Sequence, residues 1–465
     1  MESHNQNKES GKGISRRSFI GKTAAAAAAF TIVPRHVLGG PGQIAPSDKL
    51  NIACVGVGGK GSSDIESVSM ENVVALCDVD DTQMDGFVTY ARRSENPGLM
   101  DTFMKAHKYR DFRVMLEKER SIDAVVVSTP DHNHAVIAMT AIQMGKHVYV
   151  QKPLTHNVYE ARMLTKAAKE YNVATQMGNQ GHANEGARII NELIWDGAIG
   201  DVREVHVWTN RPIWPQGINA PEEIPSVPSY LDWDVWLGPA PYRHYHPAYC
   251  PFNWRGWFDF GTGVVGDMGA HIIDHPYWAL KLDAPETITA SSTPMTEDSF
   301  PLASTIQYTF PARGSMPPVK MTWYDGGLLP PRPEELEPGR RMASRDGGGI
   351  FVGDKGKLMF STYGENPRLI PESRMQEYML PEKTIPRSPG IYEEWIDACK
   401  TGKKSTTDFS YSGPLTETML LGNVALFTQR RNTILEWDSE KMEIINLPEA
   451  NEFLQREYRT GWSLK

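Results

Sequence analysis

Residues 50–61 read LNIACVGVGGKG, and this stretch decides the fold. Its first half, Leu50–Val55, is a short, mostly apolar run that is typical of a buried strand. The run leads directly into GVGGKG at residues 56–61, which fits the pattern G-x-G-x-x-G, and a helix-like stretch follows. Strand, glycine turn and helix in this order are the context in which the pattern cradles the phosphates of a dinucleotide.

The three glycines of the pattern have separate roles in such a loop. Gly56 is expected to allow the tight turn, Gly58 to let the backbone approach a pyrophosphate, and Gly61 to let helix and strand pack closely. The helix N-terminus then supplies amide donors and the positive end of its dipole. The sequence therefore predicts a dinucleotide site at the end of the first strand.

The second expected strand ends at Asp78. A carboxylate at this place can accept a hydrogen bond from the ribose 2′-hydroxyl of NAD and repel the 2′-phosphate of NADP. Asp80 and Asp81 follow, and no arginine is nearby in the sequence. The pattern favours NAD over NADP.

Residues 50–177 alternate short, β-branched runs with longer helical patterns. The expected strands are Leu50–Val55, Val73–Cys77, Ile122–Ser128, His147–Val150 and Val173–Gln176. Between them lie helical patterns such as Asp131–Met144 and Val158–Tyr171. This alternation predicts an α/β Rossmann domain at residues 48–178, a doubly wound parallel sheet with helices on both faces.

The parallel spacing is lost after residue 178. Strands are expected at Val202–Thr209, Thr287–Ser291, Ser304–Phe310, Val319–Tyr324 and Lys357–Phe360. A helix is expected over about 414–430, and the Pro-, Gly- and Arg-rich residues 325–349 predict a loop. Residues 179–465 are therefore predicted to form an α+β domain with a large, mostly antiparallel open sheet.

The N-terminal residues differ in charge from the rest. The chain of 465 residues has a net charge of −9, which disfavours a nucleic-acid partner. Residues 1–47, in contrast, are basic, with Arg16 and Arg17 ahead of an apolar run at Thr23–Val33. That run is too short to cross a ~30 Å hydrocarbon core, so no stable membrane span is expected. The segment resembles a twin-arginine signal peptide and linker, which implies export to the periplasm.

Two further motifs lie where parallel strands are expected to end. Residues 128–134 read STPDHNH and residues 148–154 read VYVQKPL. Together with the glycine loop, they resemble the glucose–fructose oxidoreductase/inositol dehydrogenase/MocA family (Gfo/Idh/MocA) over roughly residues 48–430. The resemblance implies an NAD-dependent oxidoreductase with a Rossmann domain, followed at residues 179–465 by an open-sheet domain for substrate binding and oligomerisation.

The same resemblance assigns roles to single residues. It places Thr129, Pro130, His134 and Gln151 at the cofactor and Lys152 at the substrate hydroxyl. This sequence departs from the family at Gln151, where a glutamate is usual. Loss of that carboxylate removes a neighbour that favours the charged form of Lys152.

A third constellation lies in GDMGAHIIDH at residues 266–275. Asp267 and His271 are four residues apart, so on a helix they share a face, and a histidine beside a carboxylate is a competent general base. We assign His271 as the base and Asp267 as its partner or a substrate ligand, in agreement with the family resemblance. His275 extends the stripe, which leaves open a zinc site as well as a structural role. Because no independent ligand motif accompanies it, no metal is expected.

Aromatic residues gather in the irregular part of the second domain. Tryptophans in such segments can stack on the apolar faces of sugars, or they can pack the loop onto the domain. His182, at the domain junction, is a candidate second acid or base. The candidate substrate-binding residues are His182, Trp254, Arg255, Trp257 and His275.

These observations predict an exported enzyme that oxidises a hydroxyl of a sugar or glycoside by hydride transfer to NAD. Because free NAD is not expected outside the cytoplasm, the cofactor should be tightly bound and recycled in place. One alternative is a glycosidase or lyase that acts by transient oxidation at C3 and elimination. Another is a non-catalytic sugar-binding protein with a vestigial dinucleotide fold. The family resemblance implies a homo-oligomer, a dimer or tetramer.

Overall fold

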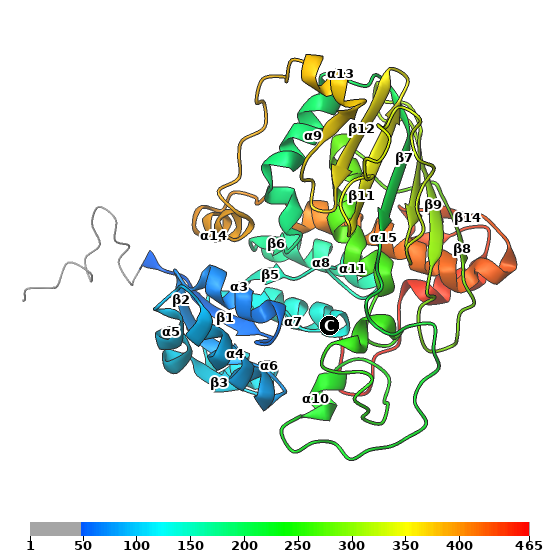
Figure 1. Ribbon diagram of the computed structural model, residues 1–465. Coiled ribbons are helices and arrows are strands. Elements are labelled where there is room, and N and C mark those ends of the chain that lie inside the picture. Colours follow the sequence, from blue (N-terminus) through cyan, green and yellow to red (C-terminus); the bar gives the residue numbers. More distant parts are fainter. Residues whose placement is uncertain (1–47, 465) are drawn as a thin grey trace, which may run out of the picture. The chain divides into compact units, whose positions relative to one another are not determined.

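The computed structural model describes residues 48–464, and from Leu50 onward the chain forms one compact unit. The expected signal peptide at residues 1–47 lies outside the described residues. Two sheets of different architecture make up the unit (Figure 1). The division into two domains at residue 178 stays a prediction.

The first sheet is a doubly wound parallel sheet, as expected. Its six strands follow the order β3-β2-β1-β4-β5-β6, and every neighbouring pair is parallel. The strands are β1 (Asn51–Val55), β2 (Asn72–Cys77), β3 (His107–Tyr109), β4 (Ala124–Val127), β5 (His147–Val150) and β6 (Thr175–Met177). The strand order reverses between β1 and β4, and open α/β sheets bind their ligands in the crevice at that point. Among the six strands of this sheet, only β3, a three-residue polar strand, was not predicted.

Helices cover both faces of this sheet because its strands bury both sets of side chains. In β1, Ala53 and Val55 contact the core beneath one set of helices, whereas Ile52 and Cys54 contact the opposite core. The first set is α6 (Phe112–Lys118), α7 (Asp131–Gln143) and α8 (Val158–Tyr171). The opposite set includes α3 (Lys60–Val68), α4 (Asp81–Arg93) and α5 (Leu99–Lys105).

The second sheet has nine strands in the order β13-β12-β11-β7-β10-β9-β8-β14-β15. All neighbouring pairs are antiparallel except β7 with β10, so the prediction of a mostly antiparallel sheet is confirmed. The strands are β7 (Val202–Thr209), β8 (Thr287–Ser292), β9 (Ser304–Phe310), β10 (Val319–Tyr324), β11 (Gly347–Gly353), β12 (Gly356–Ser361), β13 (Arg368–Ile370), β14 (Leu435–Asp438) and β15 (Glu443–Ile444).

Strand β11 begins inside the segment that was predicted to be a loop. Its glycines, which suggest a loop in the sequence, are required by close packing between β7 and β12. A Cβ atom on Gly347 would lie 2.1 Å from the carbonyl oxygen of Trp208, and one on Gly349 would lie 2.3 Å from the ring of Phe360. The prediction was wrong at this end of the segment because glycine serves close approach as well as turns.

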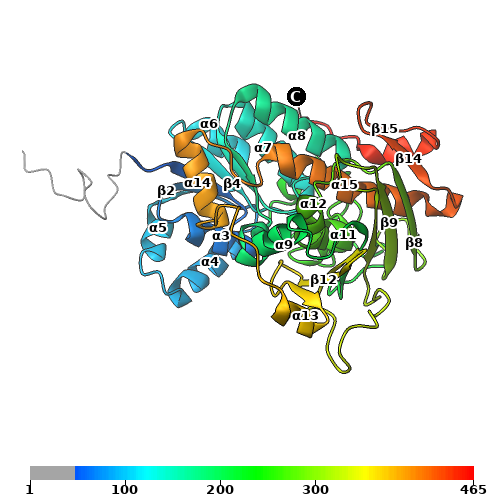
Figure 2. The ribbon, with the colours of Figure 1, turned by 90° about the horizontal axis from the view of Figure 1, so that it is seen from above.

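Helices between the two sheets cover one face of the second sheet (Figures 1 and 2). They are α9 (Glu185–Trp195), α11 (Gly263–Ile272), α12 (Asp274–Ala279) and α15 (Phe409–Thr428). Helix α15 starts before the predicted residue 414, because the Asp408 side chain accepts the Ser410 N–H at 2.9 Å and caps the helix there. Since α15 packs on α8 as well as on β8, it joins the two halves.

Two further features position the site. The segment around α10 (Trp233–Leu237) has a small core of its own, in which the rings of Trp233 and Trp236 stack with centroids 4.6 Å apart. Helix α14 (Ile391–Thr401) follows the short helix α13 (Glu372–Glu377) but returns to pack against α3 and β5 of the first sheet (Figure 2). In the described part of the chain, no helix has the length and apolar character needed to cross a membrane.

Candidate active site

A cavity of about 950 Å³ lies at the carboxyl ends of the strands of the first sheet. Its walls come from the loops after β1, β2, β4 and β5, from α11, and from the segment around α10. Of the predicted site residues, the cavity is lined by Gly56, Gly58, Asp78, Thr129, Pro130, Gln151, Lys152, Trp254, Arg255, Asp267 and His271.

The glycine loop forms one wall of the cavity in the way that the pattern predicts. Gly56 has a φ of +86°, and a Cβ atom there would lie 2.5 Å from the carbonyl oxygen of Ser128. A Cβ atom on Gly61 would lie 2.1 Å from the carbonyl oxygen of Gly56, so Gly61 serves helix–strand packing and does not itself line the cavity. The loop therefore leaves backbone at the surface where a pyrophosphate would bind.

Asp78 lies beside the glycine loop at the end of β2. Its Oδ2 accepts the Val57 N–H at 2.8 Å, and burial raises the pKa of its carboxyl to about 6. Arg110, from the end of β3, also lines this part of the cavity, although no arginine is near Asp78 in the sequence. The Nε of Arg110 donates to Asp81 Oδ1 at 3.0 Å, so this cation is already paired with a carboxylate.

The opposite part of the cavity holds an ion pair. Lys152 Nζ, after β5, donates to Asp267 Oδ1 at 2.9 Å and to the Asp267 carbonyl oxygen at 3.0 Å. Arg255 Nε is 3.5 Å from the same carboxylate oxygen. Burial alone would raise the pKa of Asp267, but the two cations lower it below its usual value. Asp267 is therefore a charged group that orients Lys152.

His271 lies one helical turn after Asp267 on α11 and faces the same cavity. Its Nδ1 is buried and has no hydrogen-bond partner among residues 48–464. Burial, with a smaller effect from Lys152, lowers the pKa of His271 to about 3. The imidazole is thus neutral, which is the form that can accept a proton. The ring of Tyr363 contacts it edge-on, with centroids 4.8 Å apart.

Some polar atoms in the cavity wall have no hydrogen-bond partner among the described residues, and they fit a bound dinucleotide. The side-chain oxygens Thr129 Oγ1, Asn133 Oδ1 and Gln151 Oε1 are buried and have no hydrogen-bond partner within the described chain. All three residues line the cavity. Buried polar atoms need partners, and the amide and hydroxyl groups of NAD are suitable ones. Together with the glycine loop and Asp78, these residues fit the cofactor.

Besides Gly61, four other predicted residues lie outside the cavity lining. His134 is buried below it, with its ring nitrogens 2.8 Å from the carbonyl oxygens of Pro153 and Thr129. It therefore supports two lining segments and does not line the cavity itself. His182 Nδ1 lies 3.0 Å from Asp274, and its ring stacks on Trp278 with centroids 4.1 Å apart.

The remaining two pack inside the second half of the chain. Trp257 is buried, and its Nε1 donates to the Ala248 carbonyl oxygen at 3.0 Å. His275 is also buried, and its ring contacts that of Phe360. In the described residues, no group of three or more His, Cys, Asp or Glu side chains is arranged to hold a metal ion. The helical stripe extends to His275 in sequence, but that side chain does not face the cavity.

Sequence reasoning missed several lining residues. Asp131, the first residue of α7, accepts from Thr262 Oγ1 at 2.6 Å, and burial raises its pKa to about 7. It directly follows Thr129 and Pro130, so the strand-end motif could have identified it. Tyr363 and Tyr392 carry no such signal, because each comes from a remote part of the chain and only the fold brings it to the cavity.

Two family profiles match the chain. The profile described as "Oxidoreductase family, NAD-binding Rossmann fold" (GFO_IDH_MocA) matches residues 50–179. The profile described as "Oxidoreductase family, C-terminal alpha/beta domain" (GFO_IDH_MocA_C2) matches residues 202–315. The two ranges together span more than half of the chain and include Lys152, Asp267 and His271.

Similar proteins include enzymes that are named for sugars. A Shewanella putrefaciens protein named "Glycosyl hydrolase family 109 protein" is 29% identical over 166 residues, which are 35% of this chain and 35% of that protein. The levoglucosan dehydrogenase of Pseudarthrobacter phenanthrenivorans is 25% identical over 164 residues, 35% of this chain and 34% of that protein. The chain spans less than half of the length of the curated relatives it matches.

A solved structure shows the same fold over most of the chain. It is the WlbA dehydrogenase from Bordetella pertussis in complex with NADH and UDP-GlcNAcA. The two structures have a TM-score of 0.58 at 15% sequence identity, over 84% of this chain and 99% of that one.

The neutral state of His271 predicts how stability changes with pH. Its pKa is about 3 in the folded chain, against about 6.5 in an unfolded one, so between these values the unfolded state binds the proton more tightly. The wild type therefore loses this stability as the pH falls from about 6.5 toward 3, whereas a His271→Gln variant does not. Urea unfolding of both proteins at about pH 7 and about pH 4.5 tests this. Equal shifts of the two midpoints would contradict a neutral His271.

Proposed function

Because the chain belongs to the Gfo/Idh/MocA oxidoreductase family, we propose that it oxidises a hydroxyl group of a sugar or glycoside by hydride transfer to bound NAD. The observation that carries the proposal is one continuous cavity. It runs from the glycine loop and Asp78 at one end to Lys152, Asp267 and His271 at the other. A dinucleotide and the groups that handle a hydroxyl proton are thus accommodated together.

The reaction needs a hydride acceptor and a proton acceptor. The NAD⁺ that the glycine loop and Asp78 would hold would supply the hydride acceptor, and the hydroxyl proton is then left to the protein as the C–OH group becomes C=O. The Lys152 ammonium, oriented by Asp267, is placed to donate a hydrogen bond to the reacting oxygen and stabilise its developing negative charge. His271 takes the proton, and the nearby carboxylates of Asp267 and Asp274 favour the imidazolium that forms.

The proposed substrate class rests on the cavity wall and on the relatives. The Arg255 guanidinium lies over the ring of Trp254, 4.3 Å from its centroid, and both residues line the cavity. An aromatic ring beside fixed polar groups suits a sugar, which has apolar C–H faces and hydroxyl edges. The names levoglucosan dehydrogenase and glycosyl hydrolase family 109 support the same class.

We expect Lys152→Ala and His271→Gln each to lower kcat by about 10²- to 10⁴-fold, because each removes a group that handles the proton. Cofactor affinity should change far less, since neither residue belongs to the glycine loop. Single-turnover formation of NADH absorbance with a panel of sugars and glycosides measures the first quantity, and NADH fluorescence titration measures the second. Unaltered turnover in both variants would refute the site assignment, and no turnover of any sugar by wild type would favour a sugar-binding protein.

A glycosidase that oxidises transiently is the second candidate, and the family 109 relative favours it. In that reaction, bound NAD would supply a transient oxidation at C3. The C3 ketone acidifies the C2 proton, elimination breaks the glycosidic bond, water adds to the product, and the ketone is then reduced again so that no NADH accumulates. Release of the aglycone without net NADH, with deuterium from solvent at C2, would establish this route. A ketosugar product with stoichiometric NADH would establish net oxidation instead.

Asp78 is proposed to make NAD the preferred cofactor. We expect Asp78→Ser to shift the ratio of NADPH to NADH affinity by about tenfold toward NADPH. The variant removes the carboxylate that repels a 2′-phosphate, and Arg110 lies at the same end of the cavity. Fluorescence titration with both reduced cofactors measures the ratio, and Asp85→Ser, an exposed α4 position, is the control. An unchanged ratio would contradict this role of Asp78.

Export through the twin-arginine route with a captive cofactor is the remaining part of the proposal. The paired Arg16 and Arg17 support it, together with the expectation that free NAD is scarce outside the cytoplasm. Replacing both arginines by lysine should leave the protein in the cytoplasmic fraction, and the exported wild type should release about one NAD(H) per chain on denaturation. Unchanged fractionation of the lysine variant would refute this route.

We further propose a dimer or tetramer, testable by light scattering, because the second sheet leaves one face without helices (Figure 2).

A further inference from the structure

A buried carboxylate that the proposed reaction does not use lies directly behind the active-site cavity. Asp64, on α3, is fully buried and does not line the cavity. Its Oδ1 accepts from Lys60 Nζ at 2.6 Å and from the Tyr392 hydroxyl at 2.6 Å. Its Oδ2 accepts from Ser128 Oγ at 2.6 Å. One carboxylate thus connects α3, the end of β4 and helix α14.

The fourth donor to Asp64 is the residue next to the proposed active-site lysine. Gln151 Nε2 lies 3.0 Å from both carboxylate oxygens of Asp64. The amide lies against Gly178, where a Cβ atom would be only 2.9 Å from it, so a residue without a side chain at position 178 makes room for this amide. Its Oε1 is left as one of the unpaired acceptors in the wall of the cofactor cavity. Asp64 therefore decides which end of the Gln151 amide is available to a ligand.

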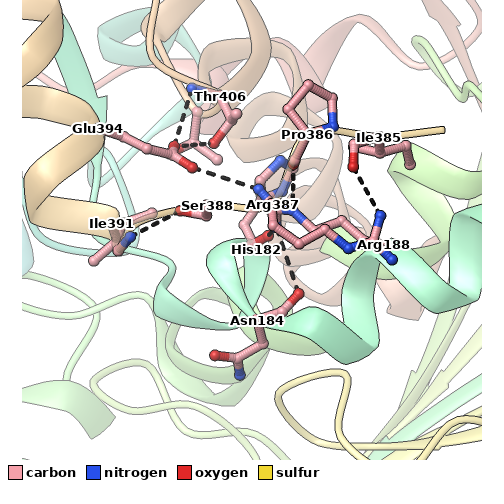
Figure 3. A network of polar contacts seen from close by, with 12 residues as sticks. His182, Asn184, Arg188, Ile385, Pro386, Arg387, Ser388, Ile391, Glu394 and Thr406 are labelled. Carbon is pink, nitrogen blue, oxygen red and sulfur yellow. Dashed lines mark hydrogen bonds and ion pairs between the residues drawn. The ribbon is translucent and has the colours of Figure 1, made fainter. Parts of the chain in front are cut away.

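Tyr392 reaches Asp64 on a helix that is itself held in place. Glu394, two residues further along α14, accepts from the Arg188 guanidinium at 3.4 Å and from the hydroxyl of Thr406 (Figure 3). Arg188 Nε also donates to the Pro386 carbonyl oxygen at 3.0 Å, in the segment that leads into α14 (Figure 3). These contacts tie α14, which carries the hydroxyl donor to Asp64, to α9 and to the residues just before α15.

The charge of Asp64 restricts the residue type at position 151. A glutamate there would bring a second carboxylate to hydrogen-bond distance of Asp64 in a buried place. The side chain of Lys60 is the cation paired with Asp64, and it is 42% exposed. Two buried carboxylates with one partly solvated cation repel each other and cannot both stay ionised. A neutral donor such as glutamine satisfies the same site.

We propose that Asp64 is a positioning residue that carries the negative charge behind the cofactor site, and that this is why glutamine stands at position 151. In the motif that this chain resembles, position 151 itself is a glutamate. In this chain the negative charge lies on α3 instead of at the strand end, and Gln151 donates to it. The inference about cofactor positioning rests on the dinucleotide site, and only its catalytic readout rests on the proposed sugar oxidation.

Exchanging the charge between the two positions tests this. The variants are D64N, Q151E and the double exchange D64N/Q151E, which restores one carboxylate and one amide in contact. Each single variant is expected to weaken NADH binding by about tenfold or more, because it leaves two amides or two carboxylates facing each other. The double variant is expected to bind NADH within about threefold of wild type and to regain most of kcat. Fluorescence titration, thermal unfolding and steady-state kinetics measure these quantities.

Asp325→Asn is the matched control. Asp325 is likewise a buried carboxylate with several donors, accepting from Ser304 Oγ at 2.7 Å and Trp323 Nε1 at 2.9 Å, but it does not line the cavity. The Asp325→Asn substitution should lower the midpoint of thermal unfolding without changing NADH affinity. If D64N does not fold, the comparison of Q151E with D64N/Q151E carries the test, since the second substitution must then improve both stability and affinity.

The proposal is overturned if the double variant binds NADH no better than Q151E, or if all three variants bind it like wild type. Because NADH affinity and unfolding are measured without a sugar, these results are independent of the proposed substrate. If the double variant recovers NADH affinity but neither it nor the wild type turns over any sugar, the proposed oxidation is refuted and the role of Asp64 is supported.

Discussion

The ion pair between Lys152 and Asp267 is the interaction on which the site depends, because it joins the end of a strand of the first sheet to a helix of the second half of the chain. Lys152 follows a strand of the parallel sheet, and Asp267 lies on the helix that covers the second sheet. Their contact places His271, one turn along that helix, at the end of the dinucleotide cavity. A buried charge whose partner is removed is strongly destabilising. The pair therefore imposes a fixed relation between the cofactor-binding half and the helix that carries the proton acceptor.

Burial gives the charged and neutral groups of the cavity different tasks. Asp267 keeps its charge because two cations face it, whereas His271 loses its proton in the same surroundings. Asp131, at the start of α7, has a raised pKa because burial outweighs its hydrogen bonds. Behind the cavity, Asp64 shares its charge among four donors. A site in which neighbouring groups are driven to opposite protonation states is suited to moving a proton at neutral pH.

Much of this arrangement could be predicted because its signals are local. The strand His147–Val150 and the helix Val158–Tyr171 have the predicted bounds, since periodicity and capping are properties of neighbouring residues. The sequence-based prediction failed where the same residue type or motif can serve two structural roles. Glycines at the start of β11 indicated a loop but serve close strand packing. His134 belongs to a motif at the cofactor, yet its ring holds two carbonyl groups from behind.

The sequence by itself determined the class of fold, the dinucleotide loop with Asp78, and the candidate trio of Lys152, Asp267 and His271. The glycine loop, Asp78 and the pair of Asp267 and His271 depend on spacing along a strand end or a helix face, which local geometry dictates. Lys152 was assigned by the resemblance of its motif to the family. Only the tertiary structure decided that Trp254 and Arg255 face the cavity whereas Trp257, His182 and His275 are packed elsewhere. It alone also brought Tyr363, Tyr392 and Asp64 to the site. The physical reason is that burial and contact between residues far apart in the chain depend on how helices pack on sheets, and no spacing in the sequence records that.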